Sequence, residues 1–305
     1  MFVGTTFPRS RSRLSPYSNF EITRTIQPTM MGVFNRMRSL LVIFNTIIMT
    51  SLPPLPPLHH LLDHHSSHYS SLLESHGFDE CSNWLIPGTV MQGQHPTHSR
   101  PAGITNTHNS STSTSTSSNR IYSIVHFAGC RTFVCLQAES PPHDNDDVND
   151  YSRSRTLLLG GFQDWKNNPT TLKSYKADVV SAVNECTTDA GVPTSAPTFI
   201  HFGIRDFDIV DSLEGLSLLI DLLGRRVRAG ETLYIHCWGG KGRAGLVSAC
   251  LLGELYGFHT LDAEEALKRV EVYANLRNSR MGGKIHSPET DEQKNQVRAF
   301  YDLRR

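Results

Sequence analysis

The chain has 305 residues, 38% of them hydrophobic and 19% charged, so it is long enough for one or two domains. Its 29 basic and 29 acidic residues cancel, which excludes the overall positive charge that binding to nucleic acid would use. The six cysteines form no CxxC pair, which favours free thiols in a reducing compartment, and we therefore expect a cytoplasmic protein.

Residues 1–78 have the composition of a disordered leader and linker. The first 62 positions contain six arginines and only one acidic residue, Glu21. The apolar run 39–49 is too short to span a bilayer, which needs about 20 residues. It follows basic residues, so a targeting segment is an alternative to a leader without function. The true start codon and the oligomeric state stay open.

The segment SLPPLPPLHHLLDHHSSHYSS, residues 51–71, is rich in proline and histidine. Its prolines predict a polyproline II linker, or a ligand for a proline-binding module. Its histidines favour a polar low-complexity tract over a metal site. They are His59, His60, His64, His65 and His68. We expect neither a metal nor another cofactor.

We expect the folded domain to cover residues 79–305, with one interruption. Residues 83–96 predict two short strands around the turn at Pro87 and Gly88. The serine- and threonine-rich insertion 97–119 has too few apolar residues to form a core.

Helix and strand patterns alternate through the rest of the chain, which predicts an α/β domain with a central mixed sheet flanked by helices. Either Asp211 or Ser212 is expected to cap one helix, and Ser287 with Pro288 to open the last one. Strands are predicted over residues 131–139, 197–202 and 232–236, and helices over 121–130, 173–191, 212–230, 243–257, 262–277 and 287–305.

The stretch HCWGGKGRAG, residues 236–245, connects a predicted strand to a predicted helix. Its glycines, Gly239, Gly240 and Gly242, allow a tight loop, and the loop amides with the helix N-terminus form an anion cradle. The same field favours the thiolate form of a cysteine. Arg243 adds a planar group that holds two phosphate oxygens. The stretch therefore predicts a nucleophile, Cys237, at the bottom of a phosphate-binding loop.

The Cys-x5-Arg pattern, with His before it and Ala-Gly after it, resembles the signature of the cysteine-dependent protein phosphatases, above all their dual-specificity branch. The wider pattern WLIPG, FVCLQAE, HCWGGKGRAG and SPET-x2-Q is similar to plant- and alga-type phosphatase-domain proteins. This resemblance implies one phosphatase domain that hydrolyses phosphotyrosine, phosphoserine and phosphothreonine through a phosphocysteine. A structural cysteine before a glycine-rich connection and a rhodanese-like sulfur transferase are the weaker alternatives.

The resemblance also assigns roles to individual residues. It makes Cys237 the nucleophile and Arg243 a phosphate ligand. Ile204-x-Asp206 resembles the acid loop of the family, so Asp206 is the expected general acid and Asp208 its alternative. The implied substrate-binding residues are Trp238, Gly239, Gly240, Lys241, Gly242 and Arg243.

Three further residues have supporting roles by resemblance. His236 is expected to brace the loop rather than transfer protons. Gln293 is expected to position the hydrolytic water, against the alternative of an ordinary surface glutamine. Ala244 departs from the Ser or Thr of many relatives, and we therefore expect slow hydrolysis of the phosphocysteine.

The substrate is expected to be a phosphorylated protein, with two alternatives. Lys241 is suited to recruit an extra phosphate, as on an inositol phosphate or phosphoinositide. Ala244 and the long insertion suit a scaffold protein that binds phosphorylated groups and hydrolyses them only weakly. Trp238 either walls the pocket or packs on a helix. Cys135 is expected to be an inert buried thiol rather than a disulfide partner of Cys237.

Overall fold

A computed structural model describes seven stretches of the chain, all within the compact unit Met49–Arg305. They are residues 51–57, 67–97, 120–140, 155–161, 174–190, 196–278 and 284–305. The apolar run 39–49, the histidines His59 to His65, the insertion after Thr97 and the acidic loop 141–150 lie outside them. Among the described helices, none is both long and apolar enough to cross a membrane.

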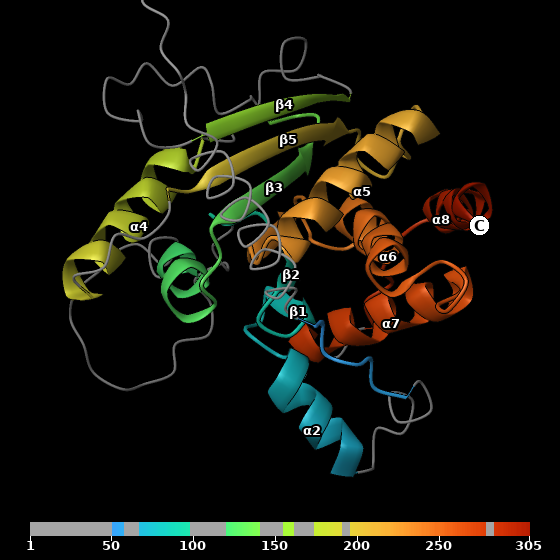
Figure 1. Ribbon diagram of the computed structural model, residues 1–305, viewed down its shortest axis with the longest axis horizontal. Helices are drawn as coiled ribbons and strands as arrows, with labels where there is room; N and C mark the ends of the chain where they lie inside the picture. The colour runs from blue at the N-terminus through green and yellow to red at the C-terminus, as the bar shows by residue number, and fades with distance from the viewer. Residues whose placement is uncertain are drawn as a thin grey trace, which may run out of the picture. The chain divides into compact units, whose positions relative to one another are not determined.

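The described strands form one mixed sheet of six, in the order β1-β2-β6-β3-β5-β4 (Figure 1). Only β1 and β2 are antiparallel, and the other neighbours run parallel. Parallel strands are buried on both faces, which explains the continuous apolar runs in the sequence. The strands are β1 (Ser82–Ile86), β2 (Val90–Gly93), β3 (Thr132–Gln137), β4 (Arg155–Gly161), β5 (Thr198–Ile204) and β6 (Leu233–His236).

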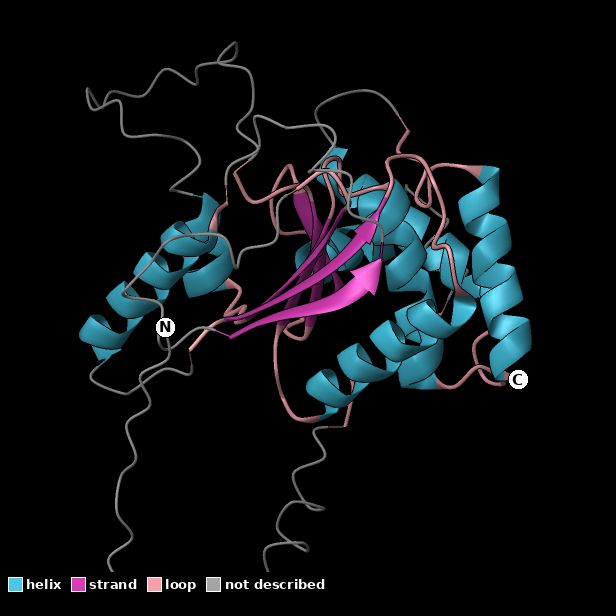
Figure 2. Cartoon of the chain, turned by 90° about the horizontal axis from the view of Figure 1, so that it is seen from above, coloured by secondary structure: helices cyan, strands magenta, loops and turns pink. Residues whose placement is uncertain are grey.

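Helices cover both faces of this sheet (Figure 2). A smaller core lies under the π-helix η2 (Ser123–Phe127) and α4 (Lys176–Ala190). A larger core lies under four helices on the opposite face. These are α5 (Leu213–Arg228), α6 (Gly242–Tyr256), α7 (Ala263–Asn275), which runs into the short η4 (Leu276–Asn278), and α8 (Asp291–Arg304). The predicted α/β class and flanked mixed sheet are confirmed.

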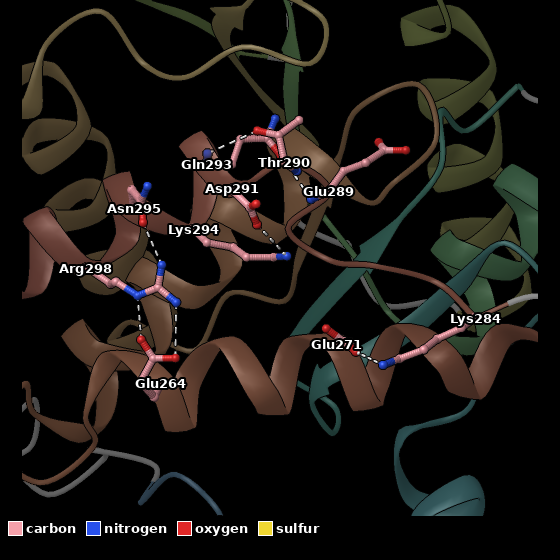
Figure 3. Close-up of polar contacts among 10 residues, drawn as sticks. All are labelled: Glu264, Glu271, Lys284, Glu289, Thr290, Asp291, Gln293, Lys294, Asn295 and Arg298. Carbon is pink, nitrogen blue, oxygen red and sulfur yellow. Dashed lines mark hydrogen bonds and ion pairs between the residues drawn. The ribbon is translucent and has the colours of Figure 1, made fainter.

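Most predicted elements are confirmed, with two differences at the level of single elements. Strand β4 was not predicted, although its three leucines in a row are typical of a buried strand. The prediction that Ser287 caps the last helix is wrong. Thr290 is the N-cap, and it shares a capping box with Gln293 (Figure 3). Ser212, not Asp211, caps α5.

Ordered structure also begins earlier than the predicted boundary at residue 79. Helix α2 (Ser67–His76) buries Leu72, and the ring of His76 stacks on Tyr273 of α7 at 4.2 Å between centroids. Burial, followed by the nearby Arg269 charge, lowers the pKa of His76 to about 4. The low-complexity composition conceals this helix because its partner lies some 200 residues further along the chain.

Candidate active site

The loop that follows β6 lies at the carboxyl edge of the sheet. Strand β6 ends at His236 and α6 begins at Gly242, so Cys237 is the first residue after the strand. Cys237 is 3% exposed, and Arg243 in the first turn of α6 is 1% exposed. The predicted strand-loop-helix arrangement is therefore present, with both side chains deep in the fold.

The loop is held from outside through its carbonyl groups. Three of these carbonyls accept hydrogen bonds from surrounding elements. The bonds are His95 N to Trp238 O (3.1 Å), Gln92 Nε2 and Arg277 Nη1 to Gly240 O (3.0 and 2.9 Å), and Ser287 Oγ to Lys241 O (2.9 Å).

These bonds fix the direction of the loop amides. In a trans peptide the C=O and the N–H point in opposite directions. The amides of Gly239, Lys241 and Gly242 follow the three anchored carbonyls, so their N–H groups point away from the donors that hold the loop. The N-terminus of α6 adds its dipole to this cluster of donors. Such a cradle suits a phosphoryl group.

Gly240 allows the loop to rest directly on β2. Its φ is +65°, and a Cβ at this position would lie 2.3 Å from the carbonyl carbon of Gly93. Any side chain here therefore meets both a disfavoured backbone conformation and a clash with backbone.

We expect Gly240→Ala to lower the free energy of unfolding by at least about 3 kcal/mol, since an αL alanine costs about 1–2 kcal/mol before the clash is added. Gly88→Ala is the matched control, because Gly88 has φ +67° with nothing within 4 Å of its Cβ position. Gly88→Ala should lower the free energy of unfolding only by the cost of an αL alanine, about 1–2 kcal/mol. Urea unfolding of both variants measures the difference, and equal losses would contradict a loop seated on β2.

Both terminal nitrogens of the Arg243 guanidinium donate to acceptors. Nη1 and Nη2 donate to the two carboxylate oxygens of Glu139, at 2.7 and 3.0 Å, and Nη1 also donates to Ile204 O at 3.1 Å. Burial alone would lower the pKa of Arg243, but the anionic form of Cys237 and the Glu139 carboxylate outweigh it and raise this pKa above its ordinary value. Arg243 is therefore a fixed cation beside Cys237.

The acid loop after β5 brings Asp206 to the same guanidinium. Asp206 Oδ1 lies 2.8 Å from Arg243 Nη2. Asp208 points elsewhere, since its carboxylate accepts from Ile209 N and lies 3.6 Å from Arg205. The structure thus brings together Cys237, Arg243 and Asp206. The general-acid role of Asp206 stays a prediction, and its position favours it over Asp208.

Helix α8 fixes the backbone of the acid loop through two glutamines. Gln293 Nε2 donates to Asp208 O at 3.0 Å. Gln296 donates to Val210 O at 2.6 Å and accepts from Val210 N at 2.8 Å. Because Gln293 is fully buried, the alternative of a surface glutamine is wrong. A Cβ added at Gly242 would lie only 2.9 Å from Gln293 Oε1, so the Gln293 side chain fills the space beside this glycine. Its role in positioning water stays a prediction.

His236 is buried under the loop among aromatic rings. Its Nε2 lies 2.6 Å from the Tyr175 hydroxyl, and its ring centroid lies 5.4 Å from that of His95. Burial raises the pKa of Tyr175, so this hydroxyl stays protonated near neutral pH. These contacts hold the His236 ring in place, as the predicted bracing role requires.

The remaining predicted residues lie around this centre. Ala244 is completely buried in the larger apolar core. Lys241 is partly buried and is the N-cap residue of α6. Trp238 is 42% exposed, with its ring 6.1 Å from that of His95. Cys135 is a free thiol whose pKa burial raises to about 12, which favours the predicted inert cysteine.

Several residues that support the loop were not predicted. Glu139 had a signal, because it ends the predicted strand 131–139 and parallel strands meet at one carboxyl edge. Gln92, Tyr175 and Arg277 had none, since each acts on the loop from a distant part of the sequence. Arg277 is buried, and desolvation lowers its pKa to about 10, which still leaves it charged near neutral pH.

A family model and a curated relative are similar to parts of this chain. Residues 177–297 match the family model described as "PTP-SAK: Swiss Army Knife protein, DSP-PTPase phosphatase domain". The "Putative tyrosine phosphatase 067L" of Invertebrate iridescent virus 3 is 27% identical over 128 residues, which are 39% of this chain and 50% of the relative. The chain therefore spans about half the length of the curated relative it matches.

Two solved structures are also similar to the chain. "Crystal structure of Tk-PTP in the active form" is 19% identical, with a TM-score of 0.40, and the match covers 73% of this chain and 97% of that one. "Crystal Structure of PTPMT1 in complex with PI(5)P" is 14% identical, with a TM-score of 0.40, and the match covers 73% and 95%.

Proposed function

We propose that the chain hydrolyses phosphate monoesters through a phosphocysteine on Cys237, because residues 177–297 match the model of a DSP-PTPase phosphatase domain. The observation that carries this proposal is the arrangement around the sulfur. Cys237 is buried at the start of the anchored loop, the buried Arg243 interacts electrostatically with it, and the Asp206 carboxylate lies 2.8 Å from Arg243 Nη2. No cofactor is needed for this chemistry.

The first displacement uses all three residues. The Cys237 thiolate attacks phosphorus, and the S–P bond forms as the bond to the leaving oxygen breaks. Arg243 and the loop amides hold the equatorial oxygens. Asp206, in its protonated form, gives its proton to the leaving oxygen. Its contact with Arg243 Nη2, a phosphate ligand in this proposal, supports the role.

The second displacement releases phosphate. Water attacks the phosphocysteine, the Asp206 carboxylate takes the proton of this water, and the thiolate leaves. No hydroxyl follows Arg243, because residue 244 is alanine in the apolar core. This supports the expectation of a slow second step.

The favoured substrate is a phosphorylated protein. Two exposed aromatic residues directly follow the two reactive ones: Phe207, 61% exposed, follows Asp206, and Trp238, 42% exposed, follows Cys237. Phe207 also has a φ of +60°, a conformation that non-glycine residues rarely adopt. Apolar rings at these positions suit the residues that flank a phosphoamino acid better than they suit a free inositol ring.

The second candidate substrate is an inositol phosphate or phosphoinositide, motivated by Lys241 in the loop. We expect Trp238→Ala to raise KM for a phosphopeptide several-fold more than KM for para-nitrophenyl phosphate. We expect Lys241→Ala to leave both nearly unchanged. If Lys241→Ala instead abolishes turnover of an inositol polyphosphate that the wild-type chain prefers over phosphopeptides, the protein assignment is wrong.

Asp206→Asn should slow turnover according to the leaving group. We expect a loss of about 10² to 10⁴ in kcat for an alkyl phosphate, which needs the proton. An aryl phosphate with a strongly acidic phenol should lose far less. Asp208→Asn is the matched control and should change neither. A leaving-group series of kcat/KM measures this, and an equal loss for all esters would remove Asp206 as the acid.

A further inference from the structure

The proline segment, residues 51–57, lies on the helical layer formed by α6 and α7 (Figure 1, blue). Its sequence is SLPPLPP. Leu52 and Leu55 are partly buried against the larger apolar core, whereas Pro53 and Pro54 are exposed. This spacing of three residues equals one turn of a polyproline II helix, so one face of such a helix contacts the domain.

Hydrogen bonds from the domain to the backbone of the segment have the same period of three residues. Tyr256 Oη donates to Pro53 O at 2.8 Å, and Arg269 Nη1 donates to Pro56 O at 2.7 Å. A polyproline II backbone makes no internal hydrogen bonds, so its carbonyls remain available to a receptor. Proline also lacks an N–H, so donors to carbonyls provide the natural polar contact. Leucine side chains contact the domain at positions 52 and 55, and carbonyl oxygens accept from it at positions 53 and 56. Both sets of contacts therefore repeat every three residues.

The receptor side is built for this contact. Arg269 is only 3% exposed, and Glu265 Oε1 accepts from its Nε at 2.9 Å. This pair orients the guanidinium so that Nη1 faces the segment. Burial raises the pKa of Tyr256 to about 12, so its hydroxyl is protonated and donates near neutral pH. Aromatic side chains are typical of proline-rich peptide recognition, and the oriented arginine adds a second donor here.

We propose that Tyr256, Arg269 and the adjoining apolar surface form a recognition site for a proline-rich segment in the polyproline II conformation, with residues 51–57 as its intramolecular ligand. Two hydrogen bonds and two partly buried leucines make a weak contact by themselves. The segment is tethered nearby, because α2 is docked through His76 on Tyr273. A short tether gives a local concentration that is roughly millimolar, which keeps a weak ligand bound.

This site is separate from the active site. Helix α6 carries Arg243 in its first turn and Tyr256 at its last residue. At 1.5 Å per residue, the two positions are about 20 Å apart along the helix. The recognition site therefore does not depend on the proposed phosphatase activity.

A peptide-binding experiment tests the proposal in the full chain. Leu52→Asp with Leu55→Asp disables the internal ligand and frees the site. A fluorescent peptide SLPPLPP should bind this variant saturably and bind the wild-type chain at least about tenfold more weakly, since the tethered segment competes. Adding Tyr256→Phe should weaken peptide binding about 2- to 10-fold, the effect of one hydrogen bond. The peptide SDPPDPP is the control and should not bind.

Thermal unfolding of the full chain gives a second test with milder variants. Tyr256→Phe should lower Tm in the chain with its natural leader and leave Tm unchanged when Leu55→Ser is already present, because contacting residues are not additive. If the losses of Tm caused by Tyr256→Phe and Leu55→Ser were additive in the double variant, the proposal would be overturned. The proposal would also be overturned if the peptide did not bind the variant with Leu52→Asp and Leu55→Asp. It would be overturned as well if adding Tyr256→Phe left the affinity for the peptide unchanged.

Discussion

Replacing Cys237 by serine is expected to lower kcat for para-nitrophenyl phosphate by at least about 10³-fold, because a serine hydroxyl is a far weaker nucleophile in this cradle. The variant should still bind phosphate, since the loop amides and Arg243 are unchanged. Steady-state kinetics and phosphate binding by calorimetry together separate loss of chemistry from loss of the site.

Cys186→Ser is the matched control for this substitution. Cys186 is a free, partly exposed cysteine on α4 and does not belong to the loop. Its replacement should leave kcat and KM unchanged. If Cys237→Ser retains more than a tenth of wild-type turnover while folding normally, Cys237 is not the nucleophile.

Replacing Glu139 by glutamine should reduce both stability and catalysis. The substitution leaves the buried Arg243 without its bidentate carboxylate. Breaking a buried ion pair costs about 3–5 kcal/mol, and the partial exposure of Glu139 reduces the expected loss to about 1–3 kcal/mol. Because Arg243 then loses its fixed orientation, KM should rise and kcat should fall. Urea unfolding and kinetics at neutral pH measure both effects.

The pH dependence of this loss has a definite sign. Burial alone would raise the pKa of Glu139, but its hydrogen bonds from Arg243 hold the pKa below its usual value. The pair therefore stabilises the fold above the unfolded pKa of about 4.3 and ceases to do so as pH falls through the lower folded value. The stability gap between wild type and Glu139→Gln should narrow in that acidic window.

Glu264→Gln is the control for the effect of Glu139. Glu264 pairs with Arg298 on the surface between α7 and α8 (Figure 3), where both side chains are well exposed. Exposed pairs contribute about 0–1 kcal/mol, so this variant should stay close to wild type. An equal loss in both variants would contradict a special role for the Glu139–Arg243 pair.

Local patterns predicted every described strand except β4, most helices and the loop of the site. Strand β6 and helix α6 are marked by strong apolar runs, and the glycines between them mark the turn. Cys237 and Arg243 were predictable because both belong to this continuous stretch. Asp206 followed from its place just after a strand and from the resemblance of Ile204-x-Asp206 to an acid loop.

The residues that support this stretch could not be predicted in the same way. Tyr175 reaches His236 across 61 positions of sequence, and Arg277 reaches Gly240 across 37. Such partners are set by tertiary packing, and a tyrosine or an arginine inside a helix pattern gives no local sign of it. The N-cap of α8 was misplaced for a related reason, because Ser287 uses its hydroxyl on the loop rather than on the helix.

The most direct measurement of the central claim is the identification of the phosphorylated residue during turnover. The chain is mixed rapidly with an aryl phosphate, quenched in acid and digested, and the peptides are analysed by mass spectrometry. The account predicts one phosphoryl group on the peptide that contains Cys237, accumulating because the second step is slow. Steady turnover with the phosphoryl group on another residue, or with an unmodified Cys237 at every quench time, would contradict it.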